Sequence, residues 1–363
     1  MTVISCQNSS YDPAQLDRVI ALHFERMGTQ ELIPGAKVLL KPNLLRGASP
    51  AKGITTNPAI VAAVVRYLRG RGITDIVLAD SPGGAYTPAV LRGVYGACKL
   101  DGNGYSLNTD CSYTRVHKDG FRAFNIINPI LQADVIINLP KLKTHSMTVM
   151  SGAIKNLFGS IPGLQKPELH CLNPDPNDFA KMLVELSQVV KPTYTIMDAV
   201  DAMEGDGPAG GTICHPGLTM ASRDIYALDR FCAREIMKID PNAVPMLAHS
   251  AHLAGDGEVV GEWKSEVDGF ELPKSVSVDF VSVFPKAMRG SVRAFLDKAL
   301  VALPRVIGKT CIGCGKCAES CPQHTIAIEK GKAQINLKHC ISCFCCQEMC
   351  PVKAIRTARK IKL

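Results

Sequence analysis

The chain has 363 residues, of which 46% are hydrophobic and 20% are charged. This composition excludes a largely disordered chain, and the length allows two or three domains of roughly 100–200 residues each. No run of about 18 apolar residues occurs, so no membrane-spanning helix is predicted. The first residues lack the basic and apolar regions of a secretory signal, so we expect a cytoplasmic protein. Two features are unusual, the 15 cysteines and the net charge of +8.

Strand and helix patterns alternate through the first 200 residues. Short apolar runs predict strands at residues 2–6, 37–43, 75–80, 133–140 and 194–198. Helical spacing occurs at residues 13–27, at 146–158, and at 58–70, where Asn57 is the expected cap and Pro58 the first helical residue. The alternation predicts an α/β fold with a mostly parallel sheet and helices on both faces.

Three further elements are predicted before the cysteine-rich end. Residues 223–238 have the pattern of an amphipathic helix with Ile225, Leu228, Cys232 and Ile236 in the core. Residues 275–284 alternate as a half-buried strand, and residues 293–303 form a helix leading into Pro304. We therefore expect an α/β domain over residues 1–303 and a small α+β domain over residues 304–363.

Nine cysteines lie between Cys311 and Cys350, in two copies of the pattern C-x2-C-x2-C-x3-C-P. This is the spacing of a ferredoxin with two [4Fe–4S] clusters, in which the fourth cysteine of each copy ligates the other cluster. Disulfides would suit a secreted chain, and zinc sites pair C-x2-C units over a longer loop, so both alternatives fit less well. The predicted ligands are Cys311, Cys314, Cys317 and Cys350 for cluster I, and Cys340, Cys343, Cys346 and Cys321 for cluster II. Cys345 falls outside the pattern and is interpreted as a small residue packed beside cluster II.

The positive charge is concentrated in the same segment. Residues 309–363 contain ten Lys and Arg against three Asp and Glu, which accounts for +7 of the net charge of +8. A basic electron-transfer domain favours an acidic redox partner, such as a soluble ferredoxin. The basic residues near the C-terminus also suit nucleic acid, but no aromatic stacking platform accompanies them, so nucleic-acid binding is not expected.

Polar side chains follow several predicted strands, where α/β sheets bind their ligands. Lysines at such ends suit a phosphate or a carboxylate, although any single lysine is more simply a solvated surface charge. The candidate catalytic residues are Lys141, Lys143, His145 and Lys155. The candidate residues for binding a small anionic substrate are Lys41, Asn43, Asp80, Ser81, Asn156 and Glu204.

Residues 205–211 match the pattern G-x-G-x-x-G. A dinucleotide-binding loop of that type must open a helix, whereas Pro216 and Gly217 follow here and disfavour one. We therefore predict a mobile glycine-rich loop that carries Glu204 and Asp206 beside the site. The sequence leaves open whether a flavin or another small cofactor binds in the α/β domain.

Five motifs carry a resemblance to a known family. They are Lys41-Pro-Asn, Thr56-Asn-Pro, Asp80-Ser-Pro-Gly-Gly, Leu139-Pro-Lys-Leu-Lys-Thr-His with the following Gly152-Ala-Ile-Lys-Asn-Leu-Phe-Gly, and Asp198-Ala-Val-Asp-Ala-Met-Glu-Gly. The chain resembles the prokaryotic family called domain of unknown function 362, whose members often carry a C-terminal ferredoxin module. The resemblance implies a redox setting but no reaction.

Two functions therefore stay open. The first is an iron–sulfur oxidoreductase, in which electrons pass through two clusters to or from a molecule bound by the α/β domain. The second is a non-enzymatic electron carrier whose α/β domain docks a partner enzyme.

Overall fold

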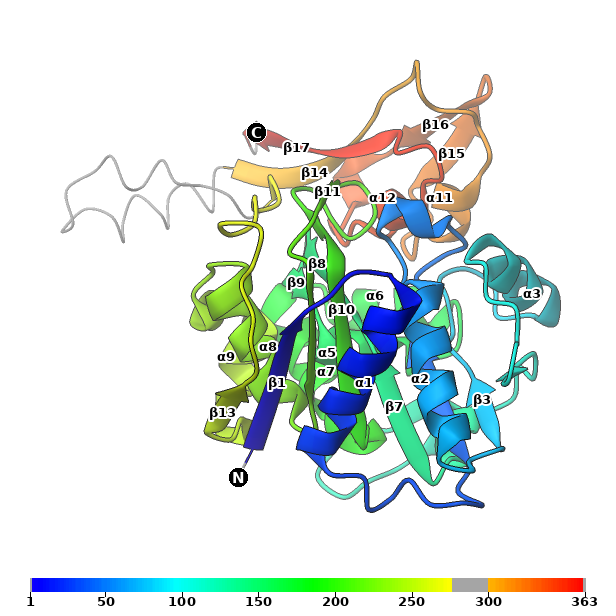
Figure 1. The fold of residues 1–363 in the computed structure, drawn as a ribbon. Helices are drawn as coiled ribbons and strands as arrows, with labels where there is room; N and C mark the ends of the chain where they lie inside the picture. Colours follow the sequence, from blue (N-terminus) through cyan, green and yellow to red (C-terminus); the bar gives the residue numbers. More distant parts are fainter. Residues whose placement is uncertain (1, 276–299, 362–363) are drawn as a thin grey trace, which may run out of the picture.

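A mixed sheet forms the centre of the α/β domain in the computed structural model, which describes residues 2–275 and 300–361 (Figure 1). Eleven strands in these ranges form this sheet, in the order β13-β1-β12-β10-β7-β2-β3-β4, with β8, β9 and β11 attached beside β10. Their bounds are β1 Thr2–Asn8, β2 Val38–Pro42, β3 Ile76–Leu78, β4 Ser106–Leu107, β7 Val135–Leu139, β8 Lys141–His145, β9 Val149–Ser151, β10 Tyr194–Glu204, β11 Thr212–Cys214, β12 Leu218–Ser222 and β13 Gly257–Val260. A separate hairpin joins β5 Tyr113–Val116 to β6 Phe124–Ile127.

Most strand pairs of the sheet are parallel, as predicted. β7, β2, β3 and β4 run parallel to one another, and β10 is parallel to both β7 and β8. β12 is antiparallel to its neighbours β1 and β10. The carboxyl ends of β2, β3, β7 and β10 consequently meet at one edge of the sheet, which is where a ligand site is expected.

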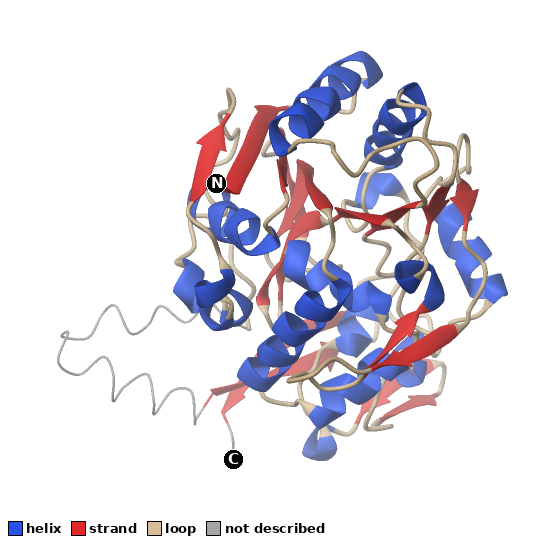
Figure 2. Cartoon of the chain, turned by 90° about the horizontal axis from the view of Figure 1, so that it is seen from below, coloured by secondary structure: helices blue, strands red, loops and turns tan. Residues whose placement is uncertain are grey.

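Helices cover both faces of the sheet (Figure 2). On one face α1 Pro13–Met27, α2 Pro58–Gly70 and α3 Pro88–Ala97 pack over Leu40 of β2. On the other face α5 Ala153–Asn156, α7 Pro176–Val190, α8 Ile225–Phe231 and α9 Pro245–His249 pack over the adjacent Leu39. Successive residues of a buried strand thus enter two different cores. Helices α4 Asn128–Leu131 and α6 Gln165–Leu172 lie in connecting segments.

Several predicted elements are confirmed. Helix α1 has the predicted bounds, and α2 begins after Asn57, whose side chain accepts a hydrogen bond from the N–H of Ala59 at 2.9 Å. The four predicted core residues of the 223–238 segment are buried, although this segment is α8 followed by a π-helical turn at Cys232–Ile236.

The helix predicted over residues 146–158 is wrong. Val149 has a φ of 68°, and β9 pairs with β8 before the chain reaches α5. A helix begins only at Ala153, because the buried carboxylate of Asp229 accepts hydrogen bonds from the N–H groups of Ala153 (2.7 Å) and Ile154 (2.9 Å). This capping interaction comes from a residue far along the chain, so local spacing does not reveal it.

The segment before the C-terminal module is described only in part. The predicted strand at 275–284 falls outside the described residues except for its first residue, as does the predicted helix at 293–303 except for residues 300–303. Those last residues are not helical. They belong to β14 Leu300–Val306, because antiparallel pairing with β17 Ile355–Ile361 satisfies their backbone groups.

The C-terminal module lies at the carboxyl edge of the sheet (Figure 1). Besides β14 and β17 it contains α11 Lys316–Glu319, a hairpin of β15 Ile326–Glu329 and β16 Lys332–Ile335, and α12 Cys345–Met349. Arg46 Nε, beyond β2, donates to the carbonyl of Glu348 at 2.8 Å. Gly83, beyond β3, faces α12 so closely that a Cβ there would lie 2.6 Å from Sδ of Met349. No helix in the described ranges is both long and apolar enough to cross a membrane.

Candidate functional site

A cavity with about 800 Å³ of empty space, part of it open to solvent, lies between the sheet edge and the C-terminal module. Strand ends of the α/β domain form one wall, and Cys345, Glu348 and Met349 of α12 contribute to the other. The cavity brings together eight of the ten residues predicted from strand ends, namely Asn43, Asp80, Ser81, Lys141, Lys143, His145, Lys155 and Asn156. Lys41 and Glu204 do not line it.

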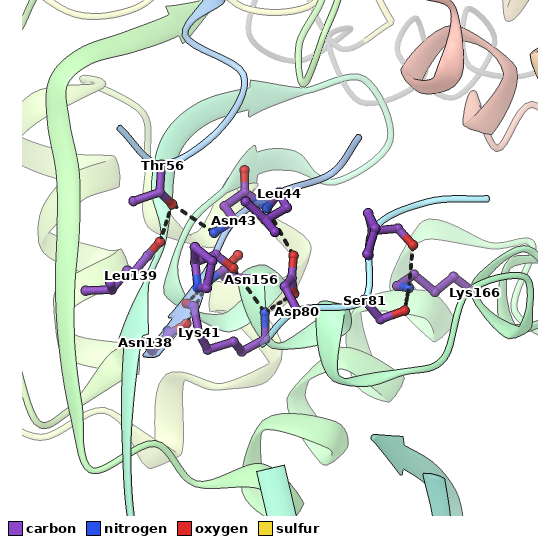
Figure 3. A network of polar contacts seen from close by, with 12 residues as sticks. Lys41, Asn43, Leu44, Thr56, Asp80, Ser81, Asn138, Leu139, Asn156 and Lys166 are labelled. Atoms are coloured by element: carbon purple, nitrogen blue, oxygen red, sulfur yellow. Dashed lines mark hydrogen bonds and ion pairs between the residues drawn. The ribbon is translucent and has the colours of Figure 1, made fainter. Parts of the chain in front are cut away.

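Lys41 lies beneath the cavity in a buried ion pair with Asp80 (Figure 3). Its Nζ is 2.7 Å from Oδ1 of Asp80, and Oδ2 of the same carboxylate accepts a hydrogen bond from the N–H of Leu44 at 3.0 Å. Gly159 packs against this pair, and a Cβ at that position would overlap Oδ1 of Asp80. Lys41 therefore holds the loops after β2 and β3 together instead of facing a ligand.

Glu204 also has a different position from the predicted one. Its Oε2 accepts a hydrogen bond from the N–H of Glu271 at 2.9 Å, and Asp206 Oδ1 accepts one from the N–H of Lys274 at 2.9 Å. The two carboxylates fasten the segment around residue 271 to the glycine-rich loop. The loop itself contributes Pro208 to the cavity wall.

Lys141 faces the cavity, but its charge is paired with a carboxylate in a buried network. Its Nζ lies 2.9 Å from Oδ2 of Asp198 and donates to the hydroxyl of Tyr11 at 2.8 Å. The Tyr11 hydroxyl in turn donates to Oδ1 of Asp198 at 2.9 Å. This network neutralises the Lys141 charge next to β10, so a bound anion gains little from it.

Lys143 differs from Lys141 because its partners are neutral. Nζ donates to Oδ1 of Asn43 at 2.6 Å and to the carbonyl of Ile54 at 2.7 Å, which leaves one N–H free for the cavity. Burial lowers the pKa of Lys143 to about 7, against the opposing attraction of Glu348. Such an ammonium both attracts an anion and releases a proton near neutral pH.

Lys166 is a cavity residue that sequence reasoning missed. It lies on α6, where Nζ donates to Oγ of Ser81 at 3.0 Å and to the carbonyl of Pro82 at 3.2 Å (Figure 3). Burial lowers its pKa to about 7. Helix α6 follows another helical segment and not a strand, so a search restricted to strand ends does not find this lysine.

Lys155 has no hydrogen-bond acceptor within residues 2–275 and 300–361. Its Nζ lies over the rings of Phe158 and Phe179, 5.4 and 5.7 Å from the centroids. Burial lowers the pKa of this lysine. An ammonium held against aromatic faces and directed to a cavity is available to a ligand.

His145 joins the two modules across the cavity. Its Nε2 lies 3.0 Å from Oε1 of Glu348, and its Nδ1 accepts hydrogen bonds from the N–H groups of Met147 (3.0 Å) and Thr148 (3.3 Å). Burial lowers the pKa of His145 to about 4, so at neutral pH the ring is uncharged with its proton on Nε2. Glu348 was not predicted from the sequence, because a glutamate between two cluster cysteines carries no signal of its own.

The cysteines of the C-terminal module form two adjoining groups. Cys317 interacts with Cys311 and Cys350, whereas Cys346 interacts with Cys340, Cys343 and Cys321 and also with Cys317. The first group holds three of the four cysteines predicted for cluster I, without Cys314, and the second holds the four predicted for cluster II. The crossed ligand sets stay a prediction from the spacing. In the described ranges no three His, Cys, Asp or Glu converge as a single metal ion requires, whereas a cubane, with one cysteine on each iron, keeps its ligands further apart.

The surroundings of these thiols fit iron–sulfur clusters. The N–H groups of Ala333 and Ala354 point at the sulfurs of Cys311 (3.4 Å) and Cys350 (3.1 Å), and those of Thr325 and Ser342 point at Cys321 and Cys340 (both 3.4 Å). Such N–H···S bonds stabilise the negative charge of a cluster. A mostly apolar cavity of about 320 Å³ adjoins the second group, between Ile326, Ile335 and Phe344.

Comparisons with known proteins agree with this description. A family model described as "Domain of unknown function (DUF362)" matches residues 38–234, more than half of the chain. The chain belongs to this family. A thylakoid-associated protein of Synechocystis sp. is 34% identical over 282 residues, which cover 72% of this chain and 84% of that protein.

A second family model, a 4Fe-4S dicluster domain, matches residues 303–351. The DUF362 chain is therefore an iron–sulfur protein of the electron-transfer type. Two solved structures show only a partial likeness. A Thermotoga maritima protein has a TM-score of 0.36 at 10% identity over 51% of this chain and 50% of its own. The lactate racemase apoprotein of Thermoanaerobacterium thermosaccharolyticum has a TM-score of 0.34 at 14% identity over 54% of this chain and 50% of its own.

Proposed function

We propose that this DUF362 protein is an oxidoreductase that moves electrons between an acidic redox protein and a small anion held in the cavity. One observation carries the proposal. Helix α12 contributes Glu348, and Cys345 next to the predicted ligand Cys346, to the same cavity that Lys143, Lys155 and Lys166 line. The electron-transfer module and an anion-binding site thus share a wall. A pure carrier has no need of such a cavity beside its cluster ligands.

Two [4Fe–4S] clusters, ligated by the crossed sets named above, would each supply one-electron transfer. The adjoining positions of Cys317 and Cys346 support passage between them. On the cavity side, α12 carries the predicted cluster II ligand Cys346 in the same helix as Glu348. We therefore assign the second cluster to the substrate side.

An exposed part of the module around Cys314 suits the redox partner. Cys314 is exposed, and Ile312 beside it is 61% exposed. Lys309 and Lys316 are exposed in the same segment. A small apolar contact flanked by Lys309 and by Lys316, which also lies 3.5 Å from Glu319, favours an acidic protein that docks at cluster I. We place the reaction in the cytoplasm, where thiols stay reduced.

The cavity lysines have two roles in this proposal. Lys143 and Lys166, with pKa values of about 7, hold the anion when protonated and hold or release a proton at Nζ as charge on the ligand changes. The neutral His145 keeps Glu348 in place through its Nε2 proton. The wall formed by Phe158, Met349 and Pro208 limits access of water to the ligand.

The test uses holoprotein purified without oxygen. Iron, sulfide and bound small molecules are measured, and the chemically reduced protein is then mixed with candidate carboxylates and phosphates while the cluster absorbance is followed. We expect about eight irons per chain and reoxidation by a small anion, slowed in Lys143→Met. Eight irons with no bound molecule and no anion-dependent reoxidation would establish the carrier function instead.

The partner is tested separately by electron transfer with an acidic ferredoxin. We expect the rate to fall with rising salt and in Lys316→Glu, and to stay unchanged in the control Lys181→Glu on α7. A salt-independent rate would exclude electrostatic docking.

A further inference from the structure

Three charges at the cavity lack an opposite partner of their own. The Asp80 and Asp198 carboxylates are already paired with Lys41 and Lys141. The remaining charged side chains of the cavity are the ammonium groups of Lys143, Lys155 and Lys166 and the carboxylate of Glu348. His145 is uncharged at neutral pH. Among these side chains alone, the cavity with protonated lysines has an excess of two positive charges, and the ammonium groups not opposed by Glu348 can hold a ligand with two acidic groups.

The unused hydrogen-bonding groups divide the cavity into two donor positions. Lys155 donates to no acceptor in the described parts of the chain, so it forms the first position. Lys166 and Ser81 form the second. Oγ of Ser81 accepts from the N–H of Gly163 (2.8 Å) and from Nζ of Lys166 (3.0 Å), so the Ser81 hydroxyl proton is free to be donated.

One unused group at the cavity is an acceptor. Asn156 is only 5% exposed, and its Nδ2 donates to Oδ1 of Asn138 (2.8 Å) and to the carbonyl of Lys41 (3.3 Å) (Figure 3). Its Oδ1 has no partner. A buried carbonyl oxygen without a donor is costly, so a ligand that brings a hydroxyl group would stabilise this site. His170, 3% exposed, likewise has an unpartnered Nδ1 at the cavity.

The cavity offers no stacking surface for a nucleotide or a flavin. Phe158 already carries Lys155 and meets His170 edge-on, at 5.8 Å between centroids, and His170 stacks on Phe179 at 4.1 Å. The described lining includes no tyrosine or tryptophan. The first N–H groups of α5, which could otherwise bind a phosphate, are bonded to Asp229.

We infer that the cavity binds a small aliphatic dicarboxylate that carries a hydroxyl group. One carboxylate lies at Lys155, the other at Lys166 and Ser81, and the hydroxyl donates to Oδ1 of Asn156. This inference rests on the proposed function in taking the cavity as the substrate site, and it names the substrate class. Lys155 is the residue that distinguishes a dicarboxylate from a monocarboxylate.

Calorimetric titration of the oxidised holoprotein tests the inference without electron transfer. The probes are L-malate, succinate, butyrate, inorganic phosphate and flavin mononucleotide. We expect malate to bind most tightly, succinate about fivefold more weakly because it lacks the hydroxyl, and butyrate at least about tenfold more weakly. Tighter binding of phosphate or of the flavin, equal binding of butyrate and malate, or no binding at all would overturn it.

Substitutions of Lys155 test whether malate binds at this position of the cavity. Lys155→Met should weaken malate binding at least about tenfold and remove the preference over butyrate, whereas Lys181→Met on the exposed face of α7 should not change it. The cluster absorbance shows that each variant is folded, and Lys155→Gln replaces Lys155→Met if that variant loses the clusters. Unchanged malate binding in both Lys155 variants contradicts the inference.

The two proposals fail in different ways. If dicarboxylates bind but neither reduce the oxidised clusters nor reoxidise the reduced ones, the proposed oxidoreductase function is wrong and the ligand class stands. If a monoanion reoxidises the clusters while no dicarboxylate binds, the ligand class is wrong and the oxidoreductase function stands.

Discussion

Nε2 of His145, at the end of β8, lies 3.0 Å from Oε1 of Glu348 on α12, and both side chains are largely buried. The N–H groups of Met147 and Thr148 point at Nδ1, so the imidazole proton is on Nε2, the nitrogen that makes this polar contact with the carboxylate. This bond ties the anion-binding edge of the sheet to a helix that carries a predicted cluster ligand. A second polar link to α12 is the hydrogen bond that Arg46 Nε donates to the carbonyl of Glu348 at 2.8 Å.

The His145–Glu348 bond should stabilise the module interface. Glu348→Ala leaves the buried Nε2–H unpaired, and we expect it to lower the free energy of unfolding by about 1–3 kcal/mol. Glu348→Gln retains an acceptor for Nε2–H and should lower the free energy of unfolding by less than Glu348→Ala does. The apparent unfolding midpoints in urea of the two holoproteins, measured without oxygen, provide the comparison. Equal loss in both variants would mean that the charge of Glu348, not its hydrogen bond, matters.

The buried Lys41–Asp80 pair predicts a strong effect of removing one partner. Lys41→Met leaves the Asp80 carboxylate buried without its counter-ion, which should cost about 3–5 kcal/mol. The double variant Lys41→Met/Asp80→Asn removes both charges and still offers an oxygen to the N–H of Leu44, so most of the stability should return. A double variant no more stable than the single variant would contradict this account.

Ligand binding should depend on pH through Lys143. Burial lowers its pKa from 10.5 to about 7, so the folded protein releases this proton before the unfolded chain does. Between about pH 7 and pH 10.5 the unfolded chain binds more protons, and the stability contribution therefore rises with pH. The affinity for an anion should instead decrease as the pH rises, because binding needs the protonated ammonium of Lys143.

The measurement is malate affinity from about pH 6 to pH 9. We expect affinity to decrease above about pH 7 in the wild type and to vary less in Lys143→Met, where Lys166 still titrates in the same range. A wild-type affinity that is constant over this range would show that neither lysine is the ionising group.

The cluster assignment predicts a division among the nine cysteines of the module. Cys314→Ala and Cys343→Ala should each remove one cluster, or about four iron atoms per chain. Cys345→Ala should retain both clusters, because Cys345 is outside the repeated spacing and lines the cavity. Iron and sulfide analysis checks this, and unchanged iron in either ligand variant would disprove the assignment.

The 4Fe-4S dicluster domain could be predicted from the sequence, because its cysteines are close along the chain and their spacing is a local property. The strand-end lysines of the α/β domain were predicted for a similar reason, since parallel strands place their carboxyl ends together. The same rule did not separate Lys41 and Lys141, which are neutralised by Asp80 and Asp198, from Lys143 and Lys155, which are not. Ion pairing depends on residues that are distant in sequence.

The sequence by itself thus determined an α/β domain, a two-copy cysteine pattern and a group of cationic strand ends, because periodicity and spacing are local properties. Only the tertiary structure showed that α12 closes the cavity with Glu348, that α6 adds Lys166, and that Lys155 and Asn156 have unused polar atoms. These features depend on which surfaces pack together and on which charges are buried beside one another. Packing and burial arise between segments far apart in the chain, and they decide where a ligand can bind.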